Sequence, residues 1–145
     1  MPRRALITGL SGFTGRHMAA HLIDRGYDVW GTTTSSPEGE VPDSVGIPVD
    51  LLDADALKSF VADARPDVVA HLAGAAHVTG HSPSTTYLVN IVGTRNLLAA
   101  LASLDKRPKS VLLASTANVY GNADVETIDE DAAIKPANDY AVSKL

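Results

Sequence analysis

The sequence predicts an α/β domain with a doubly wound parallel sheet. Three observations support this prediction: short apolar runs alternate with helical periodicities, a glycine-rich turn follows the first run, and the fourth run is almost entirely apolar. Segments that alternate in this way form right-handed βαβ crossovers, which place the strands parallel in one sheet. A run that is apolar at nearly every position is typical of a strand covered by helices on both faces.

Residues 1–51 are expected to contain three strands and one helix. The helix passes through residues 17–26, with Met18, Leu22 and Ile23 on one face, and Gly26 is expected to end it. A loop rich in Pro, Gly and Ser, at residues 34–46, replaces the crossover helix between the second and third strands. The strands expected along the whole chain are at residues 5–8, 27–31, 47–51, 66–74 and 109–116.

Two further amphipathic helices are expected. The first, at residues 53–64, has acidic residues in its first turn, where the helix dipole favours negative charge. Its apolar positions at i, i+3, i+4 and i+7 are Leu57, Phe60, Val61 and Ala64. The second is a long helix at residues 83–104, in which Ile91, Leu98 and Leu101 repeat on one side. No shift in composition marks a boundary, so residues 1–145 are expected to form one domain.

The composition restricts the class of protein. The chain has 145 residues, of which 45% are hydrophobic, and this is enough for one domain with its own core. A formal net charge of −5 argues against a nucleic-acid-binding surface, and the lack of cysteine excludes disulfides and thiolate sites. The apolar run near the N-terminus is too short for a signal peptide or a membrane span, so a cytoplasmic protein is expected. His17 and His21 have metal-ligand spacing but no third ligand, so no metal site is expected.

A glycine-rich turn, "TGLSGFTGRH", joins the first strand to the first helix. The spacing of Gly9, Gly12 and Gly15 is one residue longer in its first gap than the usual dinucleotide fingerprint. These glycines would allow a tight turn, a close backbone approach to a pyrophosphate, and packing of the helix on the strand. The N–H groups of Phe13 and Thr14, at the positive end of the helix dipole, would hold the pyrophosphate. The turn therefore predicts a Rossmann-type dinucleotide-binding domain, with an ordinary βα turn as the alternative.

The end of the second strand bears on the choice between NAD and NADP. An acidic residue there would hold the ribose 2′-hydroxyl of NAD, but residues 31–36 read "GTTTSS". Thr34, Ser35 and Arg16 can instead hold a 2′-phosphate, so NADP is preferred. If Glu38 folds back into this position, the cofactor is NAD.

A tyrosine and a lysine four residues apart lie near the end of the chain. On a helix, Tyr140 and Lys144 would share one face, where the ammonium favours the phenolate and makes the tyrosine an acid–base group. The ammonium can also donate to the ribose hydroxyls of a dinucleotide. Thr116, at the carboxyl end of the fifth strand, lies where ligands approach an open parallel sheet and supplies a hydroxyl for the reacting oxygen. A lone Y-x-x-x-K is common on exposed helices, but together with the glycine turn it predicts hydride chemistry.

With these residues the sequence resembles the extended short-chain dehydrogenase/reductase family, in particular its nucleotide-sugar epimerases, dehydratases and ketoreductases. The resemblance covers the whole chain and rests on the motifs "TGLSGFTGRH", "VDLLD", "HLAGAAHV", "NIVGTRNLL", "STANVYG" and "YAVSK". It implies a catalytic triad of Thr116, Tyr140 and Lys144. It also implies cofactor contacts, with Asp50 and Leu51 near the adenine and Asn90 steadying the neighbouring strand. The expected cofactor-binding residues are Gly9, Gly12, Phe13, Thr14, Gly15, Arg16, Thr34, Ser35, Asp50, Leu51, Leu72, Ala73, Gly74, Asn90, Tyr140 and Lys144.

The resemblance implies an NAD(P)-dependent oxidoreductase acting on a nucleotide sugar. The family's 4,6-dehydratases place acidic residues directly after the catalytic threonine, where this chain has Ala117 and Asn118, so dehydration is disfavoured. Its epimerases usually carry the second-strand acid that is missing here, and its enzymes that make the fucose precursor use a cysteine. By elimination, a 4-ketosugar reductase is the first expectation and a nucleotide-sugar 4-epimerase the second.

Members of this family continue past the helix of Tyr140 into a smaller domain that holds the nucleotide sugar. The resemblance therefore implies that residues 1–145 are an incomplete dinucleotide-binding domain, with the C-terminal substrate domain absent. If the natural protein is this short, a non-catalytic dinucleotide-binding module is the alternative. A redox sensor on the same fold would have a damaged triad, and this triad is intact. Members often pair through their long helices, so a homodimer is a further expectation.

Overall fold

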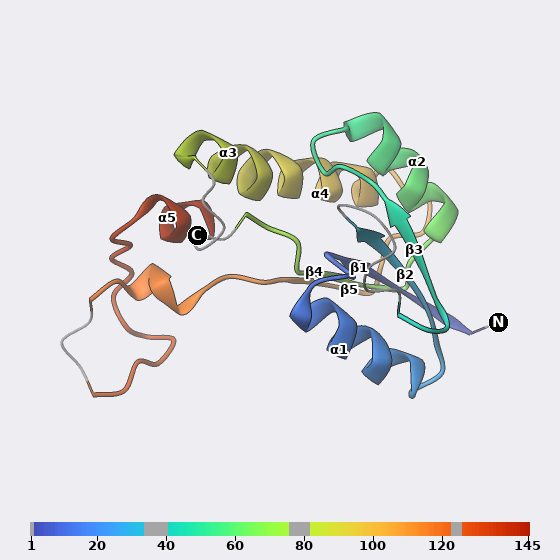
Figure 1. The fold of residues 1–145 in the computed structure, drawn as a ribbon, viewed down its shortest axis with the longest axis horizontal. Coiled ribbons are helices and arrows are strands. Elements are labelled where there is room, and N and C mark those ends of the chain that lie inside the picture. Colours follow the sequence, from blue (N-terminus) through green and yellow to red (C-terminus); the bar gives the residue numbers. More distant parts are fainter. Residues whose placement is uncertain (1, 34–40, 76–81, 123–125) are drawn as a thin grey trace.

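The computed structural model describes residues 2–33, 41–75, 82–122 and 126–145, and it confirms the predicted doubly wound sheet (Figure 1). All strand pairs are parallel, and the strand order is β3-β2-β1-β4-β5. The strands are β1 (Arg3–Thr8), β2 (Tyr27–Thr33), β3 (Ser44–Pro48), β4 (Val68–His71) and β5 (Ser110–Leu113). The helices are α1 (Phe13–Ile23), α2 (Ala54–Ala64), α3 (Pro83–Tyr87), the π-helix η2 (Leu88–Gly93), α4 (Thr94–Ala102), the 3-10 helix η3 (Ala117–Tyr120) and α5 (Asp139–Ser143).

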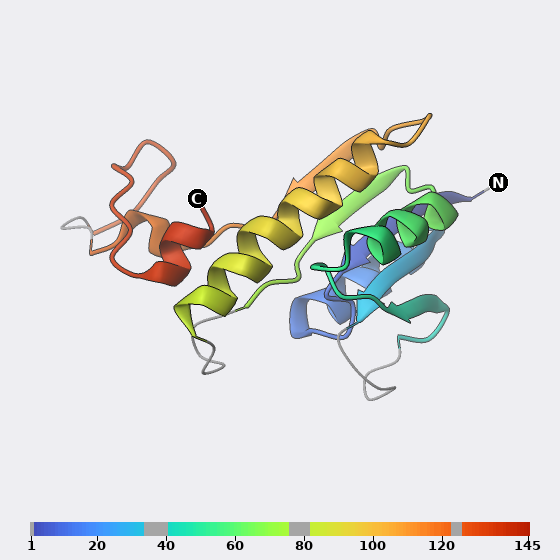
Figure 2. The same ribbon diagram turned by 90° about the horizontal axis from the view of Figure 1, so that it is seen from above.

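Helices cover the two faces of the sheet and create two separate cores. Figure 1 shows α1 on one face and α2 and α4 on the other, and Figure 2 shows α2 beside the long α3–α4 helix over the sheet. Because successive side chains of a strand point to opposite faces, Leu6 joins the core under α2 and α4, while Ile7 joins the core under α1. Both side chains are fully buried, and each burial stabilises the fold by about 2 kcal/mol.

The predicted helix faces agree with the structure in α1 and α2. Met18, Leu22 and Ile23 pack against the core under α1, and Gly26 follows the helix with a φ of 75°. The four apolar residues predicted for α2 are all buried, and the Asp53 carboxylate caps the helix by accepting from the Ala56 N–H at 3.0 Å. Local periodicity and capping chemistry therefore specify these two helices.

The third strand lies three residues earlier than predicted. The sequence places it at residues 47–51, but β3 spans Ser44–Pro48. The Val49 N–H still donates to the Thr33 carbonyl at 3.3 Å, and β2 itself ends at Thr33, so the pairing ends there. Asp50 and Leu51 consequently leave the sheet and turn toward its carboxyl edge.

The long helix predicted at residues 83–104 is interrupted by the π-helix η2, and its predicted apolar face is partly wrong. Ile91 and Leu98 are 49% and 40% exposed, whereas Leu97 is fully buried. A π-helix turn takes in an extra residue and rotates everything that follows relative to a continuous α-helix. As a result, Asn90 and not Ile91 points toward the sheet, where it is buried.

Candidate functional site

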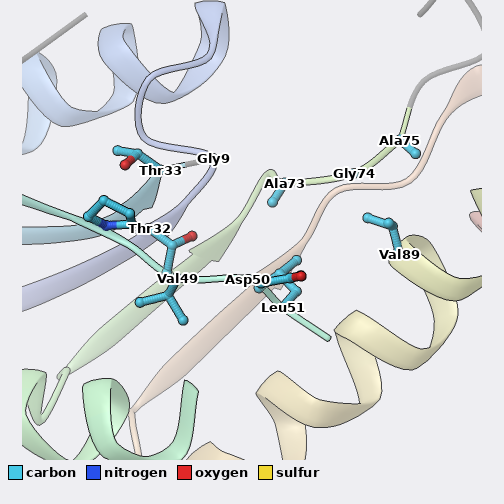
Figure 3. A pocket seen from close by; sticks show the side chains of 11 residues that line it. Gly9, Thr32, Thr33, Val49, Asp50, Leu51, Ala73, Gly74, Ala75 and Val89 are labelled. Carbon is cyan, nitrogen blue, oxygen red and sulfur yellow. The ribbon is translucent and has the colours of Figure 1, made fainter. Parts of the chain in front are cut away.

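A cavity of about 430 Å³ opens at the carboxyl ends of the parallel strands (Figure 3). It lies beside the junction of β1 and β4, where the chain reverses its direction of travel across the sheet. Open α/β sheets bind their ligands at such a switch point. The cavity is lined by Gly9, Thr32, Thr33, Pro48, Val49, Asp50, Leu51, Ala73, Gly74, Ala75 and Val89.

Gly9 of the glycine turn after β1 lines the cavity, and the turn has a conformation that needs glycine. Gly9 has a φ of 75°, and a Cβ on it would lie 3.0 Å from the Ala73 backbone. A Cβ on Gly15 would lie 2.1 Å from the Gly9 carbonyl oxygen, so α1 packs on the turn only without a side chain there. Gly12 caps α1 in an extended conformation with no side-chain hydrogen bond.

The first turn of α1 is therefore open to a ligand. Because an α-helix leaves its first N–H groups without intrahelical partners, those of Phe13 and Thr14 are available to an anion. The Phe13 side chain is 75% exposed, and Arg16, in the same turn, is also exposed. Bare backbone, free N–H groups and a guanidinium fit the pyrophosphate of a dinucleotide.

The segment after β3 forms the opposite wall. Asp50 Oδ1 accepts from the Leu52 N–H at 2.9 Å, which fixes the turn and leaves the other carboxylate oxygen free. Leu51 is buried in the core under α2 and α4. Both predicted residues therefore line the cavity, together with Val49 and two residues at the end of β2, Thr32 and Thr33, which sequence reasoning did not select.

The extension of β4 is held by Asn90. Its side-chain oxygen accepts from the Ala75 N–H at 2.8 Å, and its amide nitrogen donates to the Ala75 carbonyl at 3.2 Å. The same nitrogen donates to Ser143 Oγ at 2.8 Å, and Ser143 donates to the Tyr140 carbonyl. Asn90 thus connects the cavity-lining segment to α5. Of the other residues predicted here, Ala73 and Gly74 line the cavity, whereas Leu72 packs against the core under α1.

The Lys144 ammonium reaches the same segment. Its Nζ lies 3.6 Å from the point where a Cβ on Gly74 would stand, an ordinary contact distance that puts the ammonium beside this segment. Burial lowers the pKa of Lys144 below its usual range. Ser115 at the end of β5 donates to the Lys144 carbonyl at 2.7 Å, which holds the end of α5 against the sheet. Lys144 follows α5 by one residue, so the predicted i, i+4 pair with Tyr140 extends just beyond the helix.

Thr116 and Tyr140 are not among the residues that line the cavity. Thr116 caps η3, and its Oγ1 accepts from the Asn118 N–H at 3.2 Å. Since this bond occupies a lone pair of the hydroxyl, the hydroxyl hydrogen is left to donate to a ligand. Tyr140 lies in α5, a helix of five residues that Asn138 caps by accepting from the Ala141 N–H.

The last two residues of β2, Thr32 and Thr33, carry no charge. Thr34 and Ser35, the residues predicted to hold a 2′-phosphate, lie outside the described residues. The carboxylate of β2, Asp28, lies at the opposite end of the strand and pairs with Arg4 at 3.2 Å. It is therefore not available to a ribose in the cavity.

His71, which sequence reasoning passed over, is the last residue of β4 and lies beside the cavity. It is 2% exposed, and both of its ring nitrogens have hydrogen-bond partners. The sequence did contain a signal for this residue, because His71 lies within an apolar run. A strand covered on both faces buries a polar side chain only when that side chain has a hydrogen-bond partner.

Two other features are absent from the described residues. No group of three or more His, Cys, Asp or Glu residues there is placed to hold a metal ion. In the same part of the chain, no helix has the length and apolar character needed to cross a membrane.

Comparison with known proteins agrees with this geometry. The NAD dependent epimerase/dehydratase family matches residues 5–145. A GDP-6-deoxy-D-talose 4-dehydrogenase of Aggregatibacter actinomycetemcomitans is 33% identical over 97% of this chain and 45% of its own length. A GDP-6-deoxy-D-mannose reductase of Pseudomonas aeruginosa is 36% identical over 100% of this chain and 45% of its own length.

A solved structure described as a putative epimerase from Burkholderia cenocepacia is 58% identical, with a TM-score of 0.90, over 99% of this chain and 47% of that one. This chain therefore spans about half the length of the proteins it matches. The match over nearly all of its residues agrees with the motifs from which the resemblance to extended short-chain dehydrogenases was inferred. The chain belongs to the NAD dependent epimerase/dehydratase family.

Proposed function

We propose that this protein is a nucleotide-sugar oxidoreductase that reduces a 4-keto group, and that residues 1–145 are its dinucleotide-binding domain. The observation that carries the proposal is the Lys144 ammonium, which reaches the cavity segment at Gly74, on the cavity that begins at the glycine turn. In this proposal the cavity would hold the dinucleotide between the glycine turn at one end and the Lys144 ammonium at the other.

The dinucleotide would lie across the carboxyl ends of the strands. The N–H groups at the start of α1 would bind its pyrophosphate. Asp50 would accept from the adenine amino group, and Leu51 would lie beside the ring. The Lys144 ammonium would donate to the ribose next to the nicotinamide, above the segment of Ala73 and Gly74.

NADP is the proposed dinucleotide, with NAD as the alternative. Thr33 ends β2 in place of a carboxylate, and the Arg16 guanidinium is exposed at the start of α1. A 2′-phosphate would be attracted by this guanidinium and would meet no charge repulsion from β2, because Asp28 is paired elsewhere. The description of the family as NAD dependent supports the alternative.

The nicotinamide would supply the hydride, and the protein would supply the proton. Thr116 has its hydroxyl hydrogen free to donate to the sugar oxygen at C4, which positions the carbonyl. Tyr140 would give the proton to the same oxygen as it becomes an alkoxide. The Lys144 charge would stabilise the phenolate that remains.

A reductase is favoured over the family's other reactions. The two relatives described above are named as a 4-dehydrogenase and a reductase of GDP-6-deoxysugars. Ala117 and Asn118, which follow Thr116, carry no acid or base to remove water from the sugar. A nucleotide-sugar 4-epimerase is the second candidate, since it would use the same three residues and return the hydride to the other face.

Turnover tests these proposals. The protein is mixed with NADPH and a 4-keto-6-deoxy nucleotide sugar, and absorbance at 340 nm is followed. We expect NADPH oxidation that Tyr140→Phe reduces by a factor of about 100 or more, the lower range for loss of a general acid. Dinucleotide binding without turnover would favour the non-catalytic module, and interconversion of 4-epimers without net oxidation would favour the epimerase.

A homodimer through the long helix is also proposed. Leu88, Ile91 and Leu98 leave apolar side chains exposed along the α3–α4 helix. Light scattering on the purified protein would give twice the monomer mass if this face pairs, and the monomer mass would reject the dimer.

A further inference from the structure

His71 joins three segments around the cavity by hydrogen bonds. Its Nδ1 lies 2.6 Å from Thr8 Oγ1 at the end of β1, and its Nε2 lies 2.8 Å from Thr94 Oγ1 at the start of α4. The ring is 2% exposed and lies at the switch point between β1 and β4. None of the steps proposed above uses it.

The neighbouring bonds fix the direction of each hydrogen bond. Thr94 has one hydroxyl hydrogen and donates it to the Asn90 carbonyl, so it must accept from His71 Nε2–H. A neutral ring protonated on Nε2 has a bare Nδ1, which accepts from the Thr8 hydroxyl. Thr8 in turn accepts from the Ala73 N–H at 3.2 Å. One arrangement of protons therefore satisfies the whole series from Ala73 to Asn90.

The same series connects the functional parts of the cavity. Ala73 lines the cavity next to Gly74, and Thr8 directly precedes Gly9 of the glycine turn. At the other end, the Asn90 side chain holds both backbone groups of Ala75. His71 is thus connected to both ends of the segment of residues 73–75, to Ala73 through Thr8 and to Ala75 through Thr94 and Asn90.

A charged ring would break this arrangement. An imidazolium would carry a hydrogen on Nδ1, so Thr8 would receive two donors and its own hydrogen would lose the ring as an acceptor. Burial, together with the nearby Lys144 charge, lowers the pKa of His71 to about 4. The ring is therefore neutral at physiological pH.

We propose that His71 is a positioning residue, neutral and protonated on Nε2, that holds the segment of residues 73–75 and the Asn90 turn in place for the dinucleotide. The hydrogen-bond series itself does not depend on the proposed function. Its effect on dinucleotide binding does rest on that function.

The first test is spectroscopic and needs no ligand. Two-bond ¹⁵N–¹H correlation spectra of the histidine-labelled protein distinguish the two tautomers from the imidazolium. We expect one of the five histidines to keep the Nε2–H pattern from pH 8 to pH 5.5, and its signal to be absent from His71→Gln. An Nδ1–H pattern, or an imidazolium that forms in this range, would overturn the proposal.

The second test separates the two ends of the series. His71→Asn keeps an acceptor near Thr8, His71→Gln keeps a donor that can reach Thr94, and His71→Leu keeps neither. We expect the dissociation constant for NADPH to rise about tenfold in His71→Leu, the cost of about one hydrogen bond, and less in the two amide variants. The matched control is His21→Gln, an exposed histidine of α1 whose removal should leave binding unchanged.

The outcomes distinguish the two proposals. If wild-type protein binds NADPH or NADH and all three His71 variants bind it equally well, the positioning role is wrong. If wild-type protein binds neither dinucleotide, the proposed function fails, and the tautomer of His71 still decides whether the hydrogen-bond series is correct. If His71→Leu does not fold, the two amide variants carry the comparison, and binding equal to wild type in both would reject the proposal.

Discussion

Acidification should destabilise this protein through His71. The pKa of the ring falls from an ordinary 6.5 to about 4 on folding, first because of burial and second because of the Lys144 charge. The unfolded chain therefore binds the proton more tightly, and the stabilisation is complete above pH 6.5 and is lost as pH falls toward 4. At about 1.4 kcal/mol for each unit, the full difference is about 3 kcal/mol, of which about 2 kcal/mol is lost between pH 7 and pH 5.

Urea unfolding at several pH values, followed by circular dichroism, measures this loss. The free energy of unfolding of wild-type protein should fall by about 2 kcal/mol between pH 7 and pH 5. His71→Gln cannot titrate, so its fall over the same interval should be smaller by that amount, whereas His21→Gln should follow the wild type. An equal fall in wild type and His71→Gln would refute the assignment of a low pKa to this ring.

Three further predictions concern the glycine turn, the core and the lysine. Gly15→Ala should raise the dissociation constant for NADPH more than tenfold, because the added Cβ would press on the Gly9 carbonyl. The control is Gly46→Ala, whose Cβ would meet only an ordinary contact of 3.4 Å. Equal binding by the two variants would contradict the assignment of the pyrophosphate to the glycine turn. Leu97→Ala should lower the free energy of unfolding, measured by urea titration, by about 3 kcal/mol, because Leu97 is fully buried. Leu98 is 40% exposed, so Leu98→Ala should lower it by less than about 1 kcal/mol. Similar losses in the two variants would mean that the helix register is wrong. Lys144→Met should keep the circular dichroism spectrum but abolish NADPH oxidation, and retained turnover would exclude the lysine from the chemistry.

The sheet and the first two helices could be predicted because their signals are local. The apolar runs of β1 and β4 and the i, i+3, i+4, i+7 pattern of α2 depend on neighbouring residues alone. The glycine turn was recognisable for the same reason, since the φ of 75° at Gly9 favours glycine and a Cβ on Gly15 would meet the Gly9 carbonyl, six residues earlier.

The errors arose where distant residues decide the structure. The π-helix that turns Asn90 inward depends on its bonds to Ala75 and Ser143, which are 15 and 53 residues away. The role of His71 likewise depends on Thr8, 63 residues earlier. No spacing in the sequence indicates such partners, and the contact of Asn90 with its neighbouring strand was expected only from the resemblance to a known family.

The central claim is that the cavity at the glycine turn binds a dinucleotide, and calorimetric titration of the purified protein with NADPH and NADH tests it most directly. We predict saturable binding of one dinucleotide per chain, tighter for NADPH, that Gly15→Ala weakens more than tenfold. Tighter binding of NADH would instead place a ribose hydroxyl at the end of β2 and move the epimerase ahead of the reductase. If neither dinucleotide binds, the account of this site is wrong.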